Sequence, residues 1–144
     1  MLLKTGQMMD QFNEVDHFIV CVASSLRSDG SATMVNGVAG ELAKLHPTLP
    51  AGIGAFIKNG VGSCGCYWLR CESKIGVFQN SIMNREGANL MCISTATKRL
   101  KELAEANPDK SYALEAPNGN QPYWLVKDIL STLPDNVTVW LPST

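Results

Sequence analysis

The stretch Asp16-His17-Phe18-Ile19-Val20-Cys21-Val22-Ala23 is an almost continuous run of apolar residues that favour β-structure. A strand covered on both faces has this pattern, whereas a strand with one wet face alternates apolar and polar residues. A polar segment from Ser24 to Met34 follows, and apolar residues then recur at helical spacing between Asn36, a candidate cap, and Pro47. This order of strand, loop and helix predicts an α/β fold with residues 16–23 as a central strand.

The rest of the chain continues the alternation of strands and helices. We expect further strands at 50–58, 66–69, 74–79, 112–114 and 137–141, and helices at 88–106 and from Pro122 to about Leu130 or Thr132. Strands that alternate with helices form a largely parallel sheet with helices on both faces. The sequence therefore predicts a single domain over residues 1–144, a three-layer α/β/α domain with a mixed, largely parallel sheet.

Charge and hydropathy exclude two classes of partner. The 144 residues include 12 Lys plus Arg and 13 Asp plus Glu, so the chain has no net field to hold a nucleic acid. Its apolar runs, such as 17–23, are far shorter than the roughly 20 residues that span a bilayer. The first residues also lack the features of a secretory signal, so we expect a cytoplasmic protein without a membrane partner.

The cysteines indicate a reducing compartment. There are five, an odd number, at positions 21, 64, 66, 71 and 92, which argues against a closed disulfide framework. In Cys64-Gly65-Cys66 one residue separates the thiols, whereas zinc sites usually have two to four. We therefore expect no metal and no cofactor, and interpret these cysteines as small, half-buried side chains on strands.

Two loops are candidates for holding phosphate groups. Residues 24–36 and 117–121 each lead into an expected helix, whose first N–H groups are unpaired and attract anions. Ordinary turn chemistry is the alternative, because glycine and polar residues precede many helices. The candidate binding residues offer glycine backbone, short polar side chains, a cation or an aromatic ring: Ser24, Ser25, Arg27, Gly30, Asn36, Gly37, Val38, Asn118, Gly119, Asn120 and Tyr123. Tyr123 is the candidate to cover a base or ribose, and we expect Trp124 to pack in the core.

In this order the segments resemble the macro domain, the ADP-ribose-binding fold, and more closely the small macro-like proteins of bacteriophages. Residues 2–8 are similar to the family's first strand, and residues 15–24 to its strand Val-Asp-Ala-Ile-Val-Asn-Ala-Ala-Asn. Asn36-Gly37-Val38-Ala39-Gly40 stands where the family's glycine-rich first loop enters its helix. Residues 75–79, 105–110 and 133–140 are similar to the phage branch, so the resemblance covers nearly the whole chain.

The functional positions of the family are altered in this sequence. The aspartate that accepts a hydrogen bond from the adenine amino group corresponds to Gln7, whose amide oxygen can also accept one. The last Asn of Asn-Ala-Ala-Asn corresponds to Ser24. The second phosphate loop, usually Gly-x-Gly-x-Gly-Gly, corresponds to residues 118–124, where Gly119 is the one glycine and Pro122 lacks an N–H donor.

The resemblance implies a protein that binds an ADP-ribose-like or related nucleotide, such as a cyclic nucleotide, without turnover. For a phage protein it implies a sponge that sequesters a nucleotide signal of host defence in the host cytoplasm. One alternative is a macro-type hydrolase acting on ADP-ribosylated protein or ADP-ribose 1″-phosphate. Asp29, Glu41, His46 and Glu115 are its candidate bases, without partners visible in the sequence, and His46 is expected to end a helix. A protein-interaction module is the third hypothesis, and the oligomeric state stays open.

Overall fold

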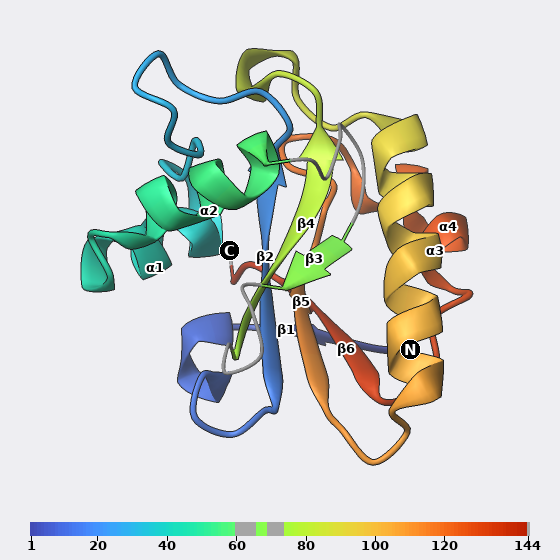
Figure 1. The fold of residues 1–144 in the computed structure, drawn as a ribbon. Helices are drawn as coiled ribbons and strands as arrows, with labels where there is room; N and C mark the ends of the chain where they lie inside the picture. Colours follow the sequence, from blue (N-terminus) through green and yellow to red (C-terminus); the bar gives the residue numbers. More distant parts are fainter. Residues whose placement is uncertain (60–65, 69–73, 144) are drawn as a thin grey trace.

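In the computed structural model, which describes residues 1–59, 66–68 and 74–143, the chain forms a mixed sheet with helices on both faces (Figure 1). The strands are β1 (Leu2–Thr5), β2 (His17–Ala23), β3 (Cys66–Trp68), β4 (Ile75–Ser81), β5 (Tyr112–Glu115) and β6 (Val137–Leu141). Their order is β1-β6-β5-β2-β4-β3, and each neighbouring pair is parallel except β3 with β4. The prediction of a mixed, largely parallel sheet is confirmed.

Strand β2 lies inside the sheet, between β5 and β4. Phe18 and Val20 are buried in the hydrophobic cluster on one face, and Ile19 is buried in the cluster on the other. A strand between two cores needs apolar side chains on both faces. This is the physical reason for the continuous apolar run, and the expected central strand is confirmed.

The helices divide between the two faces of the sheet (Figure 1). α1 (Gly37–Leu45) and α2 (Leu49–Lys58) cover one face through Leu42, Ile53 and Ile57. α3 (Leu90–Ala106) and α4 (Lys127–Leu130) cover the other, where Ile93 and Leu130 are fully buried. Short 3-10 turns, η1 (Met8–Gln11), η2 (Asn84–Glu86) and η3 (Tyr123–Leu125), complete the described elements. None of the described helices is long and apolar enough to cross a membrane.

The strand predicted at residues 50–58 is wrong, because this segment forms helix α2. Its glycine and branched residues indicated a strand, but Ile53 and Ile57 are four positions apart and are buried on one helical face. Pro50 lies in the first turn of the helix, where its missing N–H costs nothing. Gly54 packs so close to the Gly30 carbonyl that a Cβ there would lie 2.0 Å from the oxygen.

The helix predicted from Pro122 is shorter and irregular. Tyr123 begins the turn η3 and α4 follows at Lys127. Tyr123 and Val126 pack against the core, three positions apart on one side of the turn. Trp124 therefore points outward and is 71% exposed, so the expectation that it packs in the core is wrong.

The cysteine motif falls largely outside the described part of the chain. Cys64, Gly65 and Cys71 are not among the described residues. Of the two cysteines whose side chains are described, Cys21 is half-buried on β2, as expected. Cys92 is instead fully buried in helix α3.

Candidate functional site

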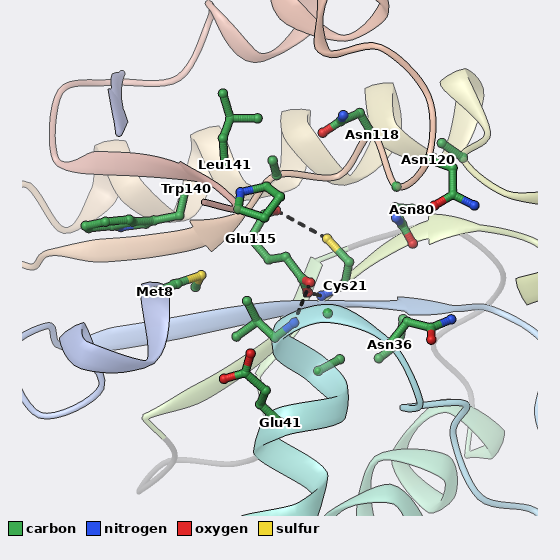
Figure 2. Close-up of a pocket in the computed structure, with 18 of the residues that line it drawn as sticks. Met8, Cys21, Asn36, Glu41, Asn80, Glu115, Asn118, Asn120, Trp140 and Leu141 are labelled. Carbon is green, nitrogen blue, oxygen red and sulfur yellow. Dashed lines mark hydrogen bonds between the residues drawn. The ribbon is translucent and has the colours of Figure 1, made fainter. Parts of the chain in front are cut away.

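A cavity of about 440 Å³ lies at the carboxyl ends of the parallel strands (Figure 2). β2 and β5 pair only between residues 17–19 and 112–114, so the two strands separate beyond Ile19. In open α/β sheets ligands bind in crevices of this kind. Each parallel strand contributes to the lining at its end or just beyond it, through Gly6, Ala23, Ser81, Glu115 and Leu141.

The two glycine-containing loops predicted from the sequence meet at this cavity. Asn36, Gly37 and Val38 line it from the start of α1, and residues 118–120 line it from the loop after β5. Gly37 has a φ of 60° and Gly119 a φ of 56°, which side chains with a Cβ rarely adopt. The structure thus brings together two loops that are far apart in the sequence.

The Glu115 carboxylate joins these parts of the site. Its Oε1 accepts a hydrogen bond from the Cys21 N–H at 2.9 Å, and its Oε2 accepts one from the Val38 N–H at 3.0 Å. Asn36 occupies the N-cap position of α1, as expected, but its side chain makes no capping hydrogen bond. Glu115, which is 77 positions from Val38 in the sequence, performs the capping instead.

The surroundings of Glu115 raise the pKa of its carboxyl group to near neutral pH. Removal from water raises the pKa of this carboxyl from 4.5 to about 7, although the main-chain N–H groups of Cys21, Val38 and Ala39 act in the opposite direction. The charge of Glu41, which also lines the cavity, raises this pKa further. Among the described residues of the lining, the charged side chains are these two carboxylates, with no Lys, Arg or His beside them.

The cavity has one amide-rich end and one apolar end, with Glu115 and Cys21 between them (Figure 2). The amide-rich end carries Asn36, Asn80, Asn118 and Asn120, and the apolar end carries Met8, Trp140 and Leu141. An amide offers both donors and acceptors, and an aromatic face suits stacking against a base.

Side-chain hydrogen bonds hold the loop after β5 in place. The Asn80 Nδ2 donates to the Pro117 carbonyl at 3.0 Å, so β4 anchors the loop. The Asn118 Nδ2 donates to the Gln121 carbonyl at 2.7 Å, and the Gln121 N–H donates to the Asn118 carbonyl. The loop is therefore shaped before any ligand binds.

Gln7 lines the cavity just after β1. Its Nε2 donates a hydrogen bond to the Ser143 Oγ at 3.1 Å. This contact uses the donor end of the amide, and a base amino group requires the acceptor end. The role of Gln7 in binding adenine stays a prediction, and the geometry is compatible with it.

Five of the predicted binding residues do not line the cavity: Ser24, Ser25, Arg27, Gly30 and Tyr123. The main-chain N–H groups of Ser24 and Ser25 donate to the carbonyls of Ser81 and Ile82, so these two residues continue along the end of β4. Ser24 and Ser25 were predicted at the site because they follow β2 directly in the sequence. The pairing with β4 carries them past it.

Arg27 and Gly30 belong to a turn that closes on itself. The Arg27 N–H donates to the Ser31 carbonyl, and the Asp29 carboxylate accepts hydrogen bonds from the Ser31 hydroxyl and N–H. The Ser31 hydroxyl, followed by its N–H, lowers the pKa of Asp29. This turn packs against Gly54 of α2 and does not line the cavity, and Asp29 is committed to holding the turn.

Tyr123 is partly buried and packs against the hydrophobic cluster to which α3 and α4 contribute. Its hydroxyl is buried and has no hydrogen-bond partner among the described residues, and burial raises the pKa of this phenol. Among the described residues, the aromatic side chain that lines the cavity is Trp140 of β6, which was not among the predicted binding residues. His46 ends α1 with its N–H bonded to the Leu42 carbonyl, as expected for a helix-end residue.

Three lining residues that were not predicted as binding residues share a feature that the sequence shows. Cys21, Asn80 and Trp140 all lie near the carboxyl ends of strands predicted from the sequence. Once those strands are taken as parallel, their ends must meet at one edge of the sheet. The sequence predicts Glu115 and Glu41 only as candidate bases, because it does not show that Glu115 contacts α1.

No protein-family model matches the sequence, and no curated protein matches it. Solved structures do. The macrodomain of Thermus aquaticus DarG superposes with a TM-score of 0.67 at 16% identity, over 99% of each chain. The macrodomain of Mycobacterium tuberculosis DarG gives 0.68 at 16% identity, over 99% of this chain and 100% of that one.

A third structure, Thermosipho africanus DarTG in complex with ADP-ribose, gives a TM-score of 0.73 at 17% identity. The match covers 98% of this chain and 42% of that one. At such identities a structural match establishes the fold, and the resemblance to phage proteins stays a prediction. The chain therefore has the macrodomain fold, a three-layer α/β/α architecture around a mixed, largely parallel sheet.

Proposed function

We propose that this chain binds an ADP-ribose-like or related nucleotide in the cavity at the carboxyl ends of its strands. The observation that carries the proposal is the convergence of Gly37 and Gly119, from two distant loops, on one cavity of about 440 Å³. Small-molecule sites have volumes of roughly 300 to 1,000 Å³. The ADP-ribose complex of the Thermosipho africanus protein, which has this fold, supports the same class of ligand.

The two ends of the cavity suit the two ends of a nucleotide. A base fits against Met8 and Trp140, with the Gln7 amide oxygen as acceptor for an exocyclic amino group. The sugar and phosphates then extend toward the amide-rich end, where the N–H groups around Gly119 and the side chains of Asn118 and Asn120 offer donors.

We propose that binding occurs without turnover. Hydrolysis needs a base that can take a proton from a positioned water. Both oxygens of Glu115 accept hydrogen bonds from main-chain N–H groups. This carboxylate therefore has a structural role, because it holds β2 and the start of α1 together. Sequestration of a nucleotide signal, as by a phage-encoded sponge, needs only affinity.

The test is calorimetric titration of the protein with ADP-ribose, cyclic ADP-ribose isomers and cyclic oligonucleotides. The bound ligand should be recovered intact by mass spectrometry after the protein is denatured. Gly119→Leu should weaken binding, whereas Gly30→Leu is the matched control: both glycines have positive φ and open space around them, but Gly30 does not line the cavity. Absence of binding by all these nucleotides would refute the proposal.

One observation favours the alternative of a hydrolase. A carboxyl group with a pKa of about 7 in a cavity is suited to general acid–base catalysis, and Glu115 is such a group. Incubation with ADP-ribosylated protein and with ADP-ribose 1″-phosphate distinguishes the two functions. Release of product by the wild type, lost in Glu115→Gln with binding retained, would favour the hydrolase.

A further inference from the structure

The main-chain donors at the start of α1 already hold an anion. The first N–H groups of a helix have no partner inside it and attract anions such as phosphate. Here the Val38 N–H donates to the Glu115 Oε2 at 3.0 Å. The same oxygen lies 2.5 Å from the position that a Cβ on Gly37 would take, so the carboxylate fills the space beside this loop.

We propose that Glu115 determines the ligand specificity of the cavity: its carboxylate occupies the donors of the α1 N-terminus and excludes an ionised phosphate from them. The ligand then places hydroxyl or amine donors against Glu115, and its phosphates bind at the loop around Gly119. This inference rests on the proposed function, because it assigns the two ends of a nucleotide within the same cavity.

The charges around Glu115 support exclusion of an anion. Three elements surround the Glu115 carboxyl. β2 contributes the Cys21 N–H, and α1 contributes the main-chain N–H groups of Val38 and Ala39 and the charge of Glu41. On β6 the residue paired with Glu115 is Trp140. The charged side chain among these is another carboxylate. A phosphate at this corner would meet two like charges in partly dehydrated surroundings, where repulsion is stronger than in water.

Protonation of Glu115 should relax this exclusion. The neutral acid no longer repels an anion, and its O–H can donate to a phosphate oxygen. Because the pKa of Glu115 is about 7, the change falls between pH 6 and pH 8. Affinity for phosphate-bearing ligands should therefore increase toward pH 6, relative to affinity for an uncharged nucleoside.

The experiment compares the wild type, Glu115→Gln and Glu41→Gln in calorimetric titrations with ADP-ribose and adenosine at pH 6 and pH 8. In the wild type, the ratio of the affinity for ADP-ribose to the affinity for adenosine should be about tenfold higher at pH 6 than at pH 8. This corresponds to about 1.4 kcal/mol. Glu115→Gln should give the higher ratio at both pH values. Glu41→Gln removes a cavity charge without freeing the α1 donors, and should change the ratio by less than about threefold.

Three results would overturn the inference: a ratio in the wild type that does not depend on pH, an unchanged ratio in Glu115→Gln, or an equal effect of Glu41→Gln. Circular dichroism and thermal melting establish that the variants are folded. The wild-type comparison needs no variant at all.

A measurement without nucleotide separates this inference from the proposed function. In ¹⁵N-labelled wild-type protein the Val38 and Cys21 amide signals should shift with a midpoint near the Glu115 pKa of about 7, and in Glu115→Gln they should not. Inorganic pyrophosphate at pH 8 should perturb the Val38 amide in Glu115→Gln and leave the wild type unperturbed. If these signals respond as stated while no nucleotide binds, the proposed function fails and the role of Glu115 stands; signals that do not respond overturn that role.

Discussion

The Glu115 Oε2 accepts a hydrogen bond from the Val38 N–H at 3.0 Å, and this contact joins the end of β5 to the start of α1 across 77 positions of the chain. The other carboxyl oxygen holds the Cys21 N–H of β2. One side chain thus fixes the position of a loop that lines the cavity relative to two strands of the sheet. Stability, pH response and ligand choice are therefore linked at this residue.

The free energy of unfolding should decrease between about pH 4.5 and 7 because of Glu115. Its pKa is about 7 in the folded protein against 4.5 ordinarily, so the folded state binds more protons in this window. The contribution of Glu115 to the free energy of unfolding is about 3 kcal/mol. It is fully present below the ordinary pKa of 4.5 and is lost as the pH rises through the folded-state pKa of about 7. Burial lowers the pKa of His17, which acts in the opposite direction. The quantity to measure by urea unfolding is therefore the difference between wild type and Glu115→Gln across this range.

The control for this prediction is Glu102→Gln. Glu102 is exposed on α3 and pairs with Arg99 at 3.7 Å, so this variant removes a surface carboxylate that does not line the cavity. The free energy of unfolding of the Glu102→Gln variant should have the same pH dependence as that of the wild type. Equal slopes for wild type and Glu115→Gln would contradict the assignment of the pH response to Glu115.

Gly37→Ala should destabilise the protein by about 2 to 3 kcal/mol, measured by urea unfolding. The φ of 60° strains any residue with a Cβ, and the new methyl would lie 2.5 Å from the Glu115 Oε2 and displace the carboxylate from Val38. Gly119→Ala has a similar φ of 56° with no described atom within 4 Å of the new Cβ, and should cost only the backbone strain. Equal losses in the two variants would show that the carboxylate moves without cost.

Gly54→Ala and Gly52→Ala, two substitutions within α2, should have opposite effects. A Cβ on Gly54 would lie 2.0 Å from the Gly30 carbonyl oxygen and 2.8 Å from the Ser31 Cα, so the variant should lose at least about 2 kcal/mol. Gly52 is exposed with no described atom within 4 Å, and alanine there should stabilise the helix by about 0.5 to 1 kcal/mol. Thermal melting of both variants measures the contrast, and a well-tolerated Gly54→Ala would contradict the close packing of α2 on residues 30–32.

Nucleotide binding should change the tryptophan fluorescence through Trp140. This side chain lines the cavity, whereas Trp124 is 71% exposed and lies outside it. The response to ADP-ribose should persist in Trp124→Phe and be largely lost in Trp140→Phe. Stacking on an aromatic ring contributes about 1 to 3 kcal/mol per base relative to alanine, and phenylalanine retains part of this, so Trp140→Phe should also weaken binding by up to about tenfold. Because the chain has a third tryptophan, Trp68, every protein compared carries Trp68→Phe, and a response that survives in Trp140→Phe would then place the base elsewhere.

The sequence predicted most of the strands and the longest helix because their patterns are local. The apolar run of β2 and the helical periodicity of α3 are each visible within one window of residues. The sequence predicts a strand in place of α2, because Gly52 and Gly54 weaken the helical signal, and only the contact of Gly54 with the Gly30 carbonyl explains the second of these glycines. Prediction from local sequence patterns fails where contact with a distant part of the backbone determines which residue fits at a position.

The sequence by itself determined the alternation of strands and helices, the burial of β2, and the two glycine loops, because these follow from periodicity and backbone preference. Only the tertiary structure decided which loop residues reach the cavity. The closed turn at Arg27 to Ser31 and the pairing of Ser24 and Ser25 with the end of β4 keep those residues away, while Trp140 is brought in. It also decided that Glu115, rather than Asn36, caps α1. The physical reason is that a hydrogen bond depends on the distance between two atoms in space, which the parallel strands set and the spacing along the chain does not.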